Sequence, residues 1–315
     1  MNKLPPVLLL MGPTASGKSH LAVHLAKAFN GEIISVDSAL VFKGMDIGTA
    51  KPTLAEREGI VHHLIDILDP AEAFSTGQFN VCATRLMADI TARHKLPILV
   101  GGTMLYFNAL TQGLAKLPHA DPSLRAKLAQ DLVLFGKQAL HQRLAEIDPD
   151  AAARIHQNDP QRVQRALEVY EITGQPMSSL FASTQSVLSA YQVVKVMLVP
   201  VERKALHDMI ALRFREMLVQ GLLEEVNSLF QRGDLHEQLP AIRAVGYRQV
   251  WSYLRGEYGL NEMTEKAIIA TRQLAKRQFT WLRKQHDAHV FQAGDAHLVA
   301  KVRSFLHEQQ GIDYE

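Results

Sequence analysis

The stretch that decides the fold is Gly12-Pro13-Thr14-Ala15-Ser16-Gly17-Lys18-Ser19, which has the form G-x-x-x-x-G-K-[ST]. An apolar run at 6–11 precedes it and predicts a buried strand. Apolar residues spaced four apart follow it and predict a helix over 17–29. A loop in this context binds phosphate, because its glycines let backbone N–H groups point inward at a helix N-terminus. A glycine-rich turn without a ligand is the alternative, but eight residues in register disfavour it.

The chemistry of the loop depends on its last two residues. Lys18 supplies a positive charge, and the Ser19 hydroxyl can ligate Mg²⁺. The loop is therefore predicted to bind a diphosphate or a nucleotide such as ATP. It does not decide what happens to that ligand, because kinases, NTPases and other transferases share it.

Strand and helix patterns extend outward from the loop. Short apolar runs alternate with helical patterns in the first 110 residues, which is typical of a parallel sheet covered by helices. We expect strands at 6–11, 32–37, 61–68, 96–101 and 193–201, with a short strand at 289–291. Four helical segments lie between the last two strands. The predicted fold is an α/β P-loop protein, a doubly wound parallel sheet with helices on both faces.

The middle of the chain lacks strand patterns. Helical stretches such as 122–135 and 160–173 are punctuated by Asp-Pro and Gly. We therefore expect an inserted all-helical domain at 116–189, between a first part of the core at 1–115 and a second, mainly helical part at 190–315.

Composition limits the class of protein. Of 315 residues 47% are apolar and 21% are charged, with a formal net charge of +2, so a polyanion site must come from local clusters. The single cysteine, Cys82, excludes an internal disulfide and a multi-cysteine zinc site. No apolar run approaches the roughly 20 residues of a membrane span. We expect a cytoplasmic monomer that does not enter a membrane.

Asp37 stands at the carboxyl end of the second predicted strand, where ligands bind in open α/β sheets. Three interpretations remain open from its position alone. It could orient Mg²⁺ or water as in a nucleotide kinase, act as a general base on an acceptor, or form a local turn with its own backbone.

Several blocks of sequence resemble the bacterial tRNA dimethylallyltransferase family, also called tRNA isopentenyltransferases. They run in family order from Gly12 to about Arg283 and comprise 12–19, Asp37-Ser38-Ala39-Leu40, 43–52, 101–106, 158–162, 165–168, 245–248 and 271–278. The resemblance implies transfer of a dimethylallyl group from dimethylallyl diphosphate to the exocyclic amine of the adenine 3′ of the anticodon, with release of pyrophosphate. The implied partners are tRNA, through its anticodon stem-loop, and the prenyl donor.

The resemblance also implies roles for individual residues. The loop 12–19 would hold the diphosphate and Mg²⁺, with Arg213 as a further diphosphate contact; Asp37 would be the base, and Thr103 would lie near the reacting centre. Implied tRNA contacts are Asp37, Ser38, Ala39, Leu40, Thr103, Arg125, Gln161, Arg162, Val163, Gln164, Arg165, Arg243, Ala244, Val245, Gly246, Tyr247 and Arg248.

Spacing alone leaves the basic clusters open. Arg162 and Arg165 are three apart beside Asp159 and Glu168, which also fits a solvated helix face with local ion pairs. The basic stretch 271–284 contains no acid and could follow phosphates, or could belong to a helix whose apolar face packs on the core. Two rival functions remain as well, a P-loop kinase of a nucleoside or small molecule and a noncatalytic RNA-binding protein.

Overall fold

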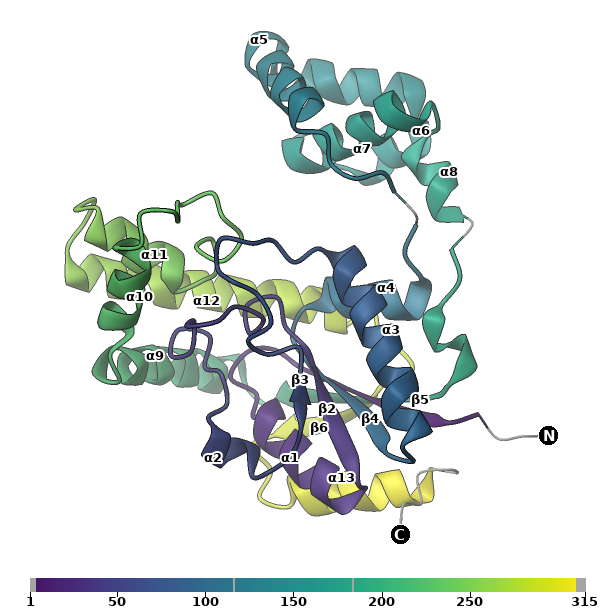
Figure 1. Cartoon of the computed structure of the whole chain (residues 1–315), viewed down its shortest axis with the longest axis vertical. Helices are drawn as coiled ribbons and strands as arrows, with labels where there is room; N and C mark the ends of the chain where they lie inside the picture. The colour runs from purple at the N-terminus through teal and green to yellow at the C-terminus, as the bar shows by residue number, and fades with distance from the viewer. Residues whose placement is uncertain (1–3, 116, 183, 310–315) are drawn as a thin grey trace. The chain divides into compact units, whose positions relative to one another are not determined.

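The computed structural model describes residues 4–115, 117–182 and 184–309. The chain divides into two compact units, Met1–Ala109 with Leu188–Glu315, and Leu110–Val187. We call them the sheet unit and the helical unit and describe each by itself (Figure 1). The predicted boundary residue Lys116 lies outside the described residues.

A six-stranded parallel sheet forms the centre of the sheet unit, in the order β3-β2-β4-β1-β5-β6. The bounds are β1 Pro6–Met11, β2 Gly31–Val36, β3 His62–His63, β4 Leu96–Gly101, β5 Gln192–Pro200 and β6 His289–Ala293. Gly101 is in register with both Met11 and Val36, so the carboxyl ends of β1, β2 and β4 meet at one edge. The predicted parallel α/β sheet of the P-loop type is confirmed.

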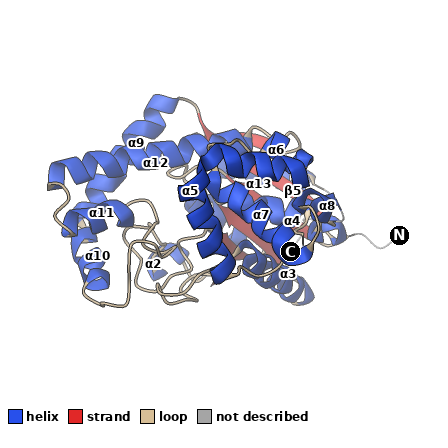
Figure 2. Ribbon diagram, turned by 90° about the horizontal axis from the view of Figure 1, so that it is seen from above, coloured by secondary structure: helices blue, strands red, loops and turns tan. Residues whose placement is uncertain are grey.

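The helices of the sheet unit are α1 Lys18–Ala28, α2 Leu54–Arg57, α3 Thr76–Ala92, α9 Arg203–Val219, α10 Leu222–Phe230, α11 Tyr247–Leu254, α12 Leu260–Leu282 and α13 Leu298–Glu308. A 3-10 helix, η1 Val187–Ala190, begins at the last residue of the helical unit, and α4 Met104–Gln112 runs across the other division. The helical unit contains α5 Pro122–Ile147, α6 Pro149–Arg154, α7 Pro160–Thr173 and α8 Met177–Ala182 (Figure 2).

Helices cover both faces of the sheet. Alternate strand residues such as Leu8 and Ile98 are buried in one core cluster with residues of α1 and α13. The strand residues between them, such as Leu9 and Leu99, are also buried and point to the opposite face, since side chains alternate along a strand. There α3 contacts β2 and β4 (Figure 1). A second core cluster joins α9 to α12 with the chain that follows β2.

The strand predicted over 61–68 was wrong in length. Only His62–His63 pair with β2. Leu64 and Asp66 have φ angles of 62° and 56°, a left-handed conformation that interrupts an extended strand. The chain beyond β3 instead folds against the loop after β2, where Ile67 N and Leu68 N both donate to the Val41 carbonyl oxygen.

Asp-Pro pairs start the long helices of the helical unit. Asp121 Oδ1 accepts from the backbone N–H groups of Ser123 and Leu124, and Asp159 Oδ1 accepts from Arg162 N. The helix predicted over 160–173 has those bounds in the structure. The one predicted over 122–135 is longer, because a helix resumes after a kink at Gly136, where φ is 79° and ψ is 171°.

In the described part of the chain, no helix combines the length and apolar character needed to cross a membrane.

Candidate active site

The loop from Gly12 to Ser19 connects the carboxyl end of β1 to α1, as the motif predicts. Ala15 and Gly17 have φ angles of 60° and 81°, so the chain turns sharply before α1 begins at Lys18. A Cβ on Gly12 would lie 2.8 Å from the Leu198 carbonyl oxygen, so the loop needs glycine there. No side chain among the described residues caps α1, and its first N–H groups can therefore bind an anion.

Lys18 lies inside this loop. Its Nζ donates to the Pro13 carbonyl oxygen at 2.6 Å and to Ser16 Oγ at 3.5 Å. Burial lowers the pKa of Lys18 to about 8; the Asp37 carboxylate opposes this shift, and the Arg213 guanidinium adds to it. The Lys18 ammonium therefore interacts electrostatically with the Asp37 carboxylate and with the Arg213 guanidinium, two residues of the same predicted site.

Arg213 lies on α9 and interacts electrostatically with Lys18. Burial lowers its pKa, and the carboxylates of Glu56 and Glu216 oppose the shift. Within the described parts of the chain its guanidinium makes no hydrogen bond or ion pair. A half-buried cation without a described protein partner, which interacts electrostatically with Lys18, favours binding of a polyanion.

Asp37 follows β2 directly and uses its two carboxylate oxygens differently. Oδ1 accepts from the backbone N–H groups of Ala39 at 2.8 Å and Leu40 at 3.4 Å, so the turn-forming interpretation is part of the structure. Oδ2 has no hydrogen-bond partner among the described residues. The carboxylate also raises the pKa of Tyr106, although burial is the larger cause. Asp37 thus forms its own turn and still presents a free oxygen.

Thr103 joins the turn after β4 to the turn after β2. Its Oγ1 accepts from Ser38 N at 3.1 Å, and its own N–H donates to the Val36 carbonyl oxygen at 3.2 Å. Two predicted site residues, Asp37 and Thr103, are therefore connected through Ser38, and the register of β2 with β4 brings them together.

Gln278 was not among the predicted site residues, yet it holds the loop in place. From α12 its buried side chain accepts from Thr14 N at 2.9 Å through Oε1 and donates to the Gly102 carbonyl oxygen at 2.9 Å through Nε2. The sequence contained a usable signal. Gln278 falls at helical spacing between the apolar residues Ala275 and Leu282, a core position where an amide needs a specific partner.

The predicted segment 243–248 precedes and begins α11. The side chains of Arg243 and Arg248 are exposed, whereas Tyr247 is fully buried. Tyr247 donates its hydroxyl proton to Glu225, so it anchors the segment rather than presenting an aromatic face. The exposed arginines are the residues that can reach a phosphate.

In the helical unit, Arg125 and Arg165 converge on one buried carboxylate. Arg125 Nε donates to Glu168 Oε1 at 2.8 Å, and Arg165 Nη1 donates to Glu168 Oε2. Arg162 is more exposed and pairs with Asp159 at 3.2 Å. Local ion pairs therefore exist on this surface, while the side chains of Arg125 and Arg162 remain 55% and 66% exposed.

A metal site made only of protein side chains does not occur in the described ranges, where no three His, Cys, Asp or Glu side chains gather around a common point.

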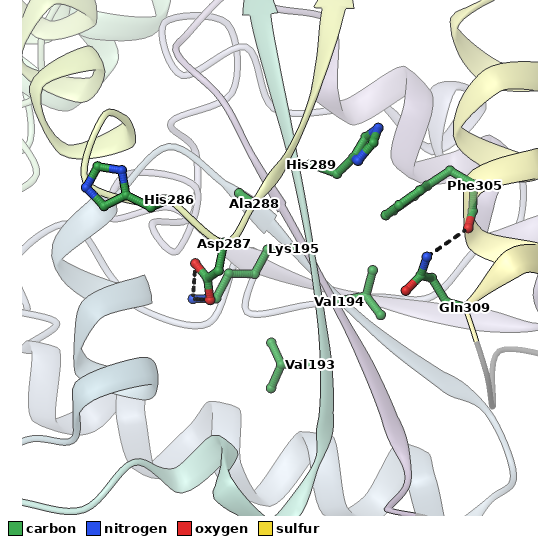
Figure 3. Close-up of a pocket in the computed structure, with 9 residues that line it drawn as sticks. All are labelled: Val193, Val194, Lys195, His286, Asp287, Ala288, His289, Phe305 and Gln309. Carbon is green, nitrogen blue, oxygen red and sulfur yellow. Dashed lines mark hydrogen bonds and ion pairs between the residues drawn. The ribbon is translucent and has the colours of Figure 1, made fainter.

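A hollow of about 280 Å³ lies at the amino ends of β5 and β6, at the opposite edge of the sheet from the phosphate loop. An ion pair of 2.7 Å between Lys195 and Asp287 lies across it (Figure 3). None of the predicted site residues lines this hollow.

Known proteins resemble this chain over most of its length. The family model "IPP transferase" matches residues 40–285. A tRNA dimethylallyltransferase of Methylococcus capsulatus is 59% identical over 292 residues, 93% of this chain and 94% of the relative. A second, of Nitrosococcus oceani, is 56% identical over 284 residues, 90% of each chain.

Solved structures resemble this chain as well. A tRNA isopentenylpyrophosphate transferase of Bacillus halodurans superposes with a TM-score of 0.71 at 39% identity, covering 96% of this chain and 95% of its own. A eukaryotic dimethylallyltransferase acting on tRNA gives 0.79 at 29% identity, covering 96% of this chain and 78% of its own. With matches of this extent and a site of this geometry, the chain belongs to the tRNA dimethylallyltransferase family.

Proposed function

We propose that this protein transfers a dimethylallyl group from dimethylallyl diphosphate to the exocyclic amine of the adenine 3′ of the anticodon in tRNA. The observation that carries the proposal is the juxtaposition of a phosphate loop and a carboxylate with one free oxygen. Lys18 and Asp37 interact electrostatically at the same edge of the sheet. A diphosphate held by the loop therefore lies next to a base that can serve an acceptor.

The diphosphate end of the donor binds to the loop 12–19. The N–H groups at the start of α1, Lys18 Nζ and the Arg213 guanidinium face the charge that develops as the allylic C–O bond breaks. They pre-exist in the fold, because Gln278 fixes the loop at Thr14. The bonding electrons of the C–O bond leave with the pyrophosphate oxygen.

The residues present fit a magnesium ion bound together with the diphosphate. Ser19 is exposed at the first turn of α1 and offers one hydroxyl ligand, and Mg²⁺ is commonly held by one or two protein groups plus phosphate oxygens and water. When bound, the ion would neutralise part of the charge on the leaving pyrophosphate.

Asp37 and Thr103 act on the acceptor, the adenine amine. An adenine amine is a weak nucleophile because its lone pair is delocalised into the ring. Asp37 Oδ2 takes the amine proton as the new C–N bond forms, while Oδ1 stays bonded to Ala39 N and Leu40 N and holds the carboxylate in position. Thr103, bonded to Ser38 N, limits the position of the acceptor beside it.

The tRNA contacts are proposed for two surfaces. In the sheet unit they are Asp37 to Leu40 and Arg243 to Arg248, where exposed arginines can meet phosphates. In the helical unit they are Arg125 and Gln161 to Arg165, except that the Val163 side chain is buried in the core of this unit and cannot itself reach an RNA. Since a stacked base cannot reach a carboxylate at the edge of the sheet, we propose that the target adenine is flipped out of the anticodon loop.

The test is incubation of the purified protein with Mg²⁺, dimethylallyl diphosphate and tRNA that lacks the modification, followed by nucleoside mass analysis. We expect dimethylallyl-adenosine and pyrophosphate in equal amounts. A parallel incubation with ATP and nucleosides tests the kinase alternative. Phosphorylated product there, without prenylated tRNA in the first incubation, would replace the proposed function.

A further inference from the structure

Glu225, on α10, fills a pocket of backbone N–H groups with its carboxylate. Oε2 accepts from Asp46 N at 2.9 Å and Ile47 N at 2.7 Å, and Oε1 accepts from Gly48 N at 3.2 Å and from the Tyr247 hydroxyl. Three consecutive N–H groups that point at one carboxylate form an anion-binding nest. Glu225 lies 177 to 179 residues from these groups in sequence, so the contact joins distant parts of the chain.

The contact of Glu225 with the N–H groups of Asp46, Ile47 and Gly48 and with the Tyr247 hydroxyl, which we call the junction, is closely packed. A Cβ on Gly48 would collide with the Tyr247 ring and with Leu222, so the loop approaches α10 and α11 as closely as glycine allows. Tyr247 is fully buried, and burial together with Glu225 raises the pKa of its hydroxyl, which therefore stays a donor at neutral pH.

One side of the junction leads to the predicted tRNA-binding turn Asp37–Leu40. The ammonium of Lys51 is buried and donates to the Phe42 carbonyl oxygen at 2.9 Å, and it pairs with the carboxylates of Asp46 and Asp66. Phe42 N in turn donates to the Ala39 carbonyl oxygen at 3.2 Å. The turn and the nest therefore form one hydrogen-bonded loop.

The other side leads to the predicted tRNA-binding segment Arg243–Arg248. Tyr247 lies between Gly246, whose N–H donates to Gln249 Oε1 at 2.9 Å, and Arg248, whose N–H donates to the Ala244 carbonyl oxygen at 3.0 Å. The backbone that carries the exposed arginines is thus fixed through the same Tyr247 that Glu225 holds.

We propose that Glu225 is a positioning residue for tRNA binding, which sets the separation between the turn Asp37–Leu40 and the segment Arg243–Arg248. The proposal rests on the proposed function, which assigns tRNA contacts to these two segments. Glu225 itself is half-buried, directs its carboxylate at these donors and need not touch the RNA. A carboxylate is required because all of its contacts in the described chain are donors, and a glutamine would turn an NH₂ group toward N–H donors.

The experiment compares Glu225→Gln with Glu224→Gln, a neighbouring exposed residue on the same helix, and with wild type. KM for tRNA, KM for dimethylallyl diphosphate and kcat are measured at a temperature where circular dichroism shows all variants folded. We expect Glu225→Gln to raise KM for tRNA about tenfold or more and to leave KM for dimethylallyl diphosphate within about twofold. Glu224→Gln should match wild type.

A residue that only stabilised the fold would change both KM values together or neither, and either result would overturn the proposal. If Glu225→Gln does not fold, Tyr247→Phe replaces it, because this variant removes one donor of the junction and keeps the ring; an unchanged KM for tRNA would then overturn the proposal.

Arg243→Ala and Arg248→Ala, measured in parallel, distinguish failure of the positioning role of Glu225 from failure of the tRNA contacts assigned to Arg243–Arg248. If they raise KM for tRNA and Glu225→Gln does not, the positioning role fails and the tRNA assignment stands. If the arginine variants leave KM for tRNA unchanged, the assignment of this segment fails, and the positioning role fails with it.

Discussion

The charged side chains at the two edges of the sheet differ in how completely the protein itself pairs them. At the amino edge, Glu32 at the start of β2 is buried and accepts from Arg93, Lys95 and His63, with distances of 2.8 Å from Arg93 Nη2, Lys95 Nζ and His63 Nε2. At the carboxyl edge, Lys18 bonds within its own loop, Asp37 Oδ2 has no partner in the described chain, and the Arg213 guanidinium has none there either.

The pKa shifts follow this difference. The hydrogen bond from Arg93 is the largest cause that keeps the pKa of Glu32 far below its usual range. At the other edge, burial moves the pKa of Lys18 down to about 8, which disfavours its charge. The charges of Glu32, Arg93 and Lys95 are satisfied within the protein, whereas at the carboxyl edge Asp37 Oδ2 and the half-buried Arg213 guanidinium have no described protein partner and can interact with a ligand. The carboxyl edge is therefore the reactive one.

Replacement of Asp37 by Asn should have the largest effect on this comparison. The amide oxygen can still accept from Ala39 N and Leu40 N, so the turn persists, but the group can no longer take a proton. We expect single-turnover prenylation of tRNA to slow by about 10²–10⁴-fold with unchanged melting temperature. A rate near that of wild type would remove Asp37 from the role of base.

Lys18→Ala should come next. Loss of one preorganised donor to the leaving pyrophosphate slows the chemical step by about 10²–10³-fold. Rapid-quench measurement at saturating dimethylallyl diphosphate isolates this step from binding. A rate unchanged at saturation, with only a weaker KM for the donor, would restrict Lys18 to ground-state binding.

Glu32→Gln should affect stability and leave catalysis alone. The two cations Arg93 and Lys95 and the His63 ring lose their carboxylate partner, and we expect about 2 kcal/mol less stability in urea unfolding at pH 7. The folded pKa of Glu32 is depressed, so its stabilisation is present above its usual pKa of 4.5 and is lost as the pH falls below that value. The difference between wild type and Glu32→Gln should therefore shrink in acid; a constant difference would contradict the pairing.

The smallest expected effect is a pH dependence of donor binding. Lys18 is charged below its pKa of about 8 and neutral above it, and the charged form binds the diphosphate. Kd for dimethylallyl diphosphate should therefore rise about tenfold between pH 7 and pH 9. Lys18→Arg keeps its charge over this range and should show a flat profile. A rise of the same size in Lys18→Arg would assign the titration to another group.

The sequence predicted those features that short stretches determine. β1 and β4 have their predicted bounds, because each is a fully buried apolar run. Asp37 could be placed at the sheet edge because its strand ends there. The early end of β3 could not be predicted, since Leu64 and Asp66 adopt left-handed conformations that depend on contacts with the loop after β2.

Long-range contacts account for most of what the sequence did not reveal. Gln278 reaches Thr14 across 264 residues, and Glu225 reaches Ile47 across 178. Nothing local to either residue identifies its partner. The different roles of the two Asp37 oxygens likewise could not be read from the sequence. The turn-forming and general-base interpretations both fit that sequence, and only the structure shows that Oδ1 forms the turn.

The most direct test of the difference between the two edges is single-turnover formation of dimethylallyl-adenosine by wild type, Asp37→Asn and Glu32→Gln, at a temperature where all three are folded. The reactive carboxyl edge predicts equal rates for wild type and Glu32→Gln and at least about 10²-fold slower product formation by Asp37→Asn. Product formed by Asp37→Asn at the rate of wild type, or a comparable loss in Glu32→Gln, would contradict it.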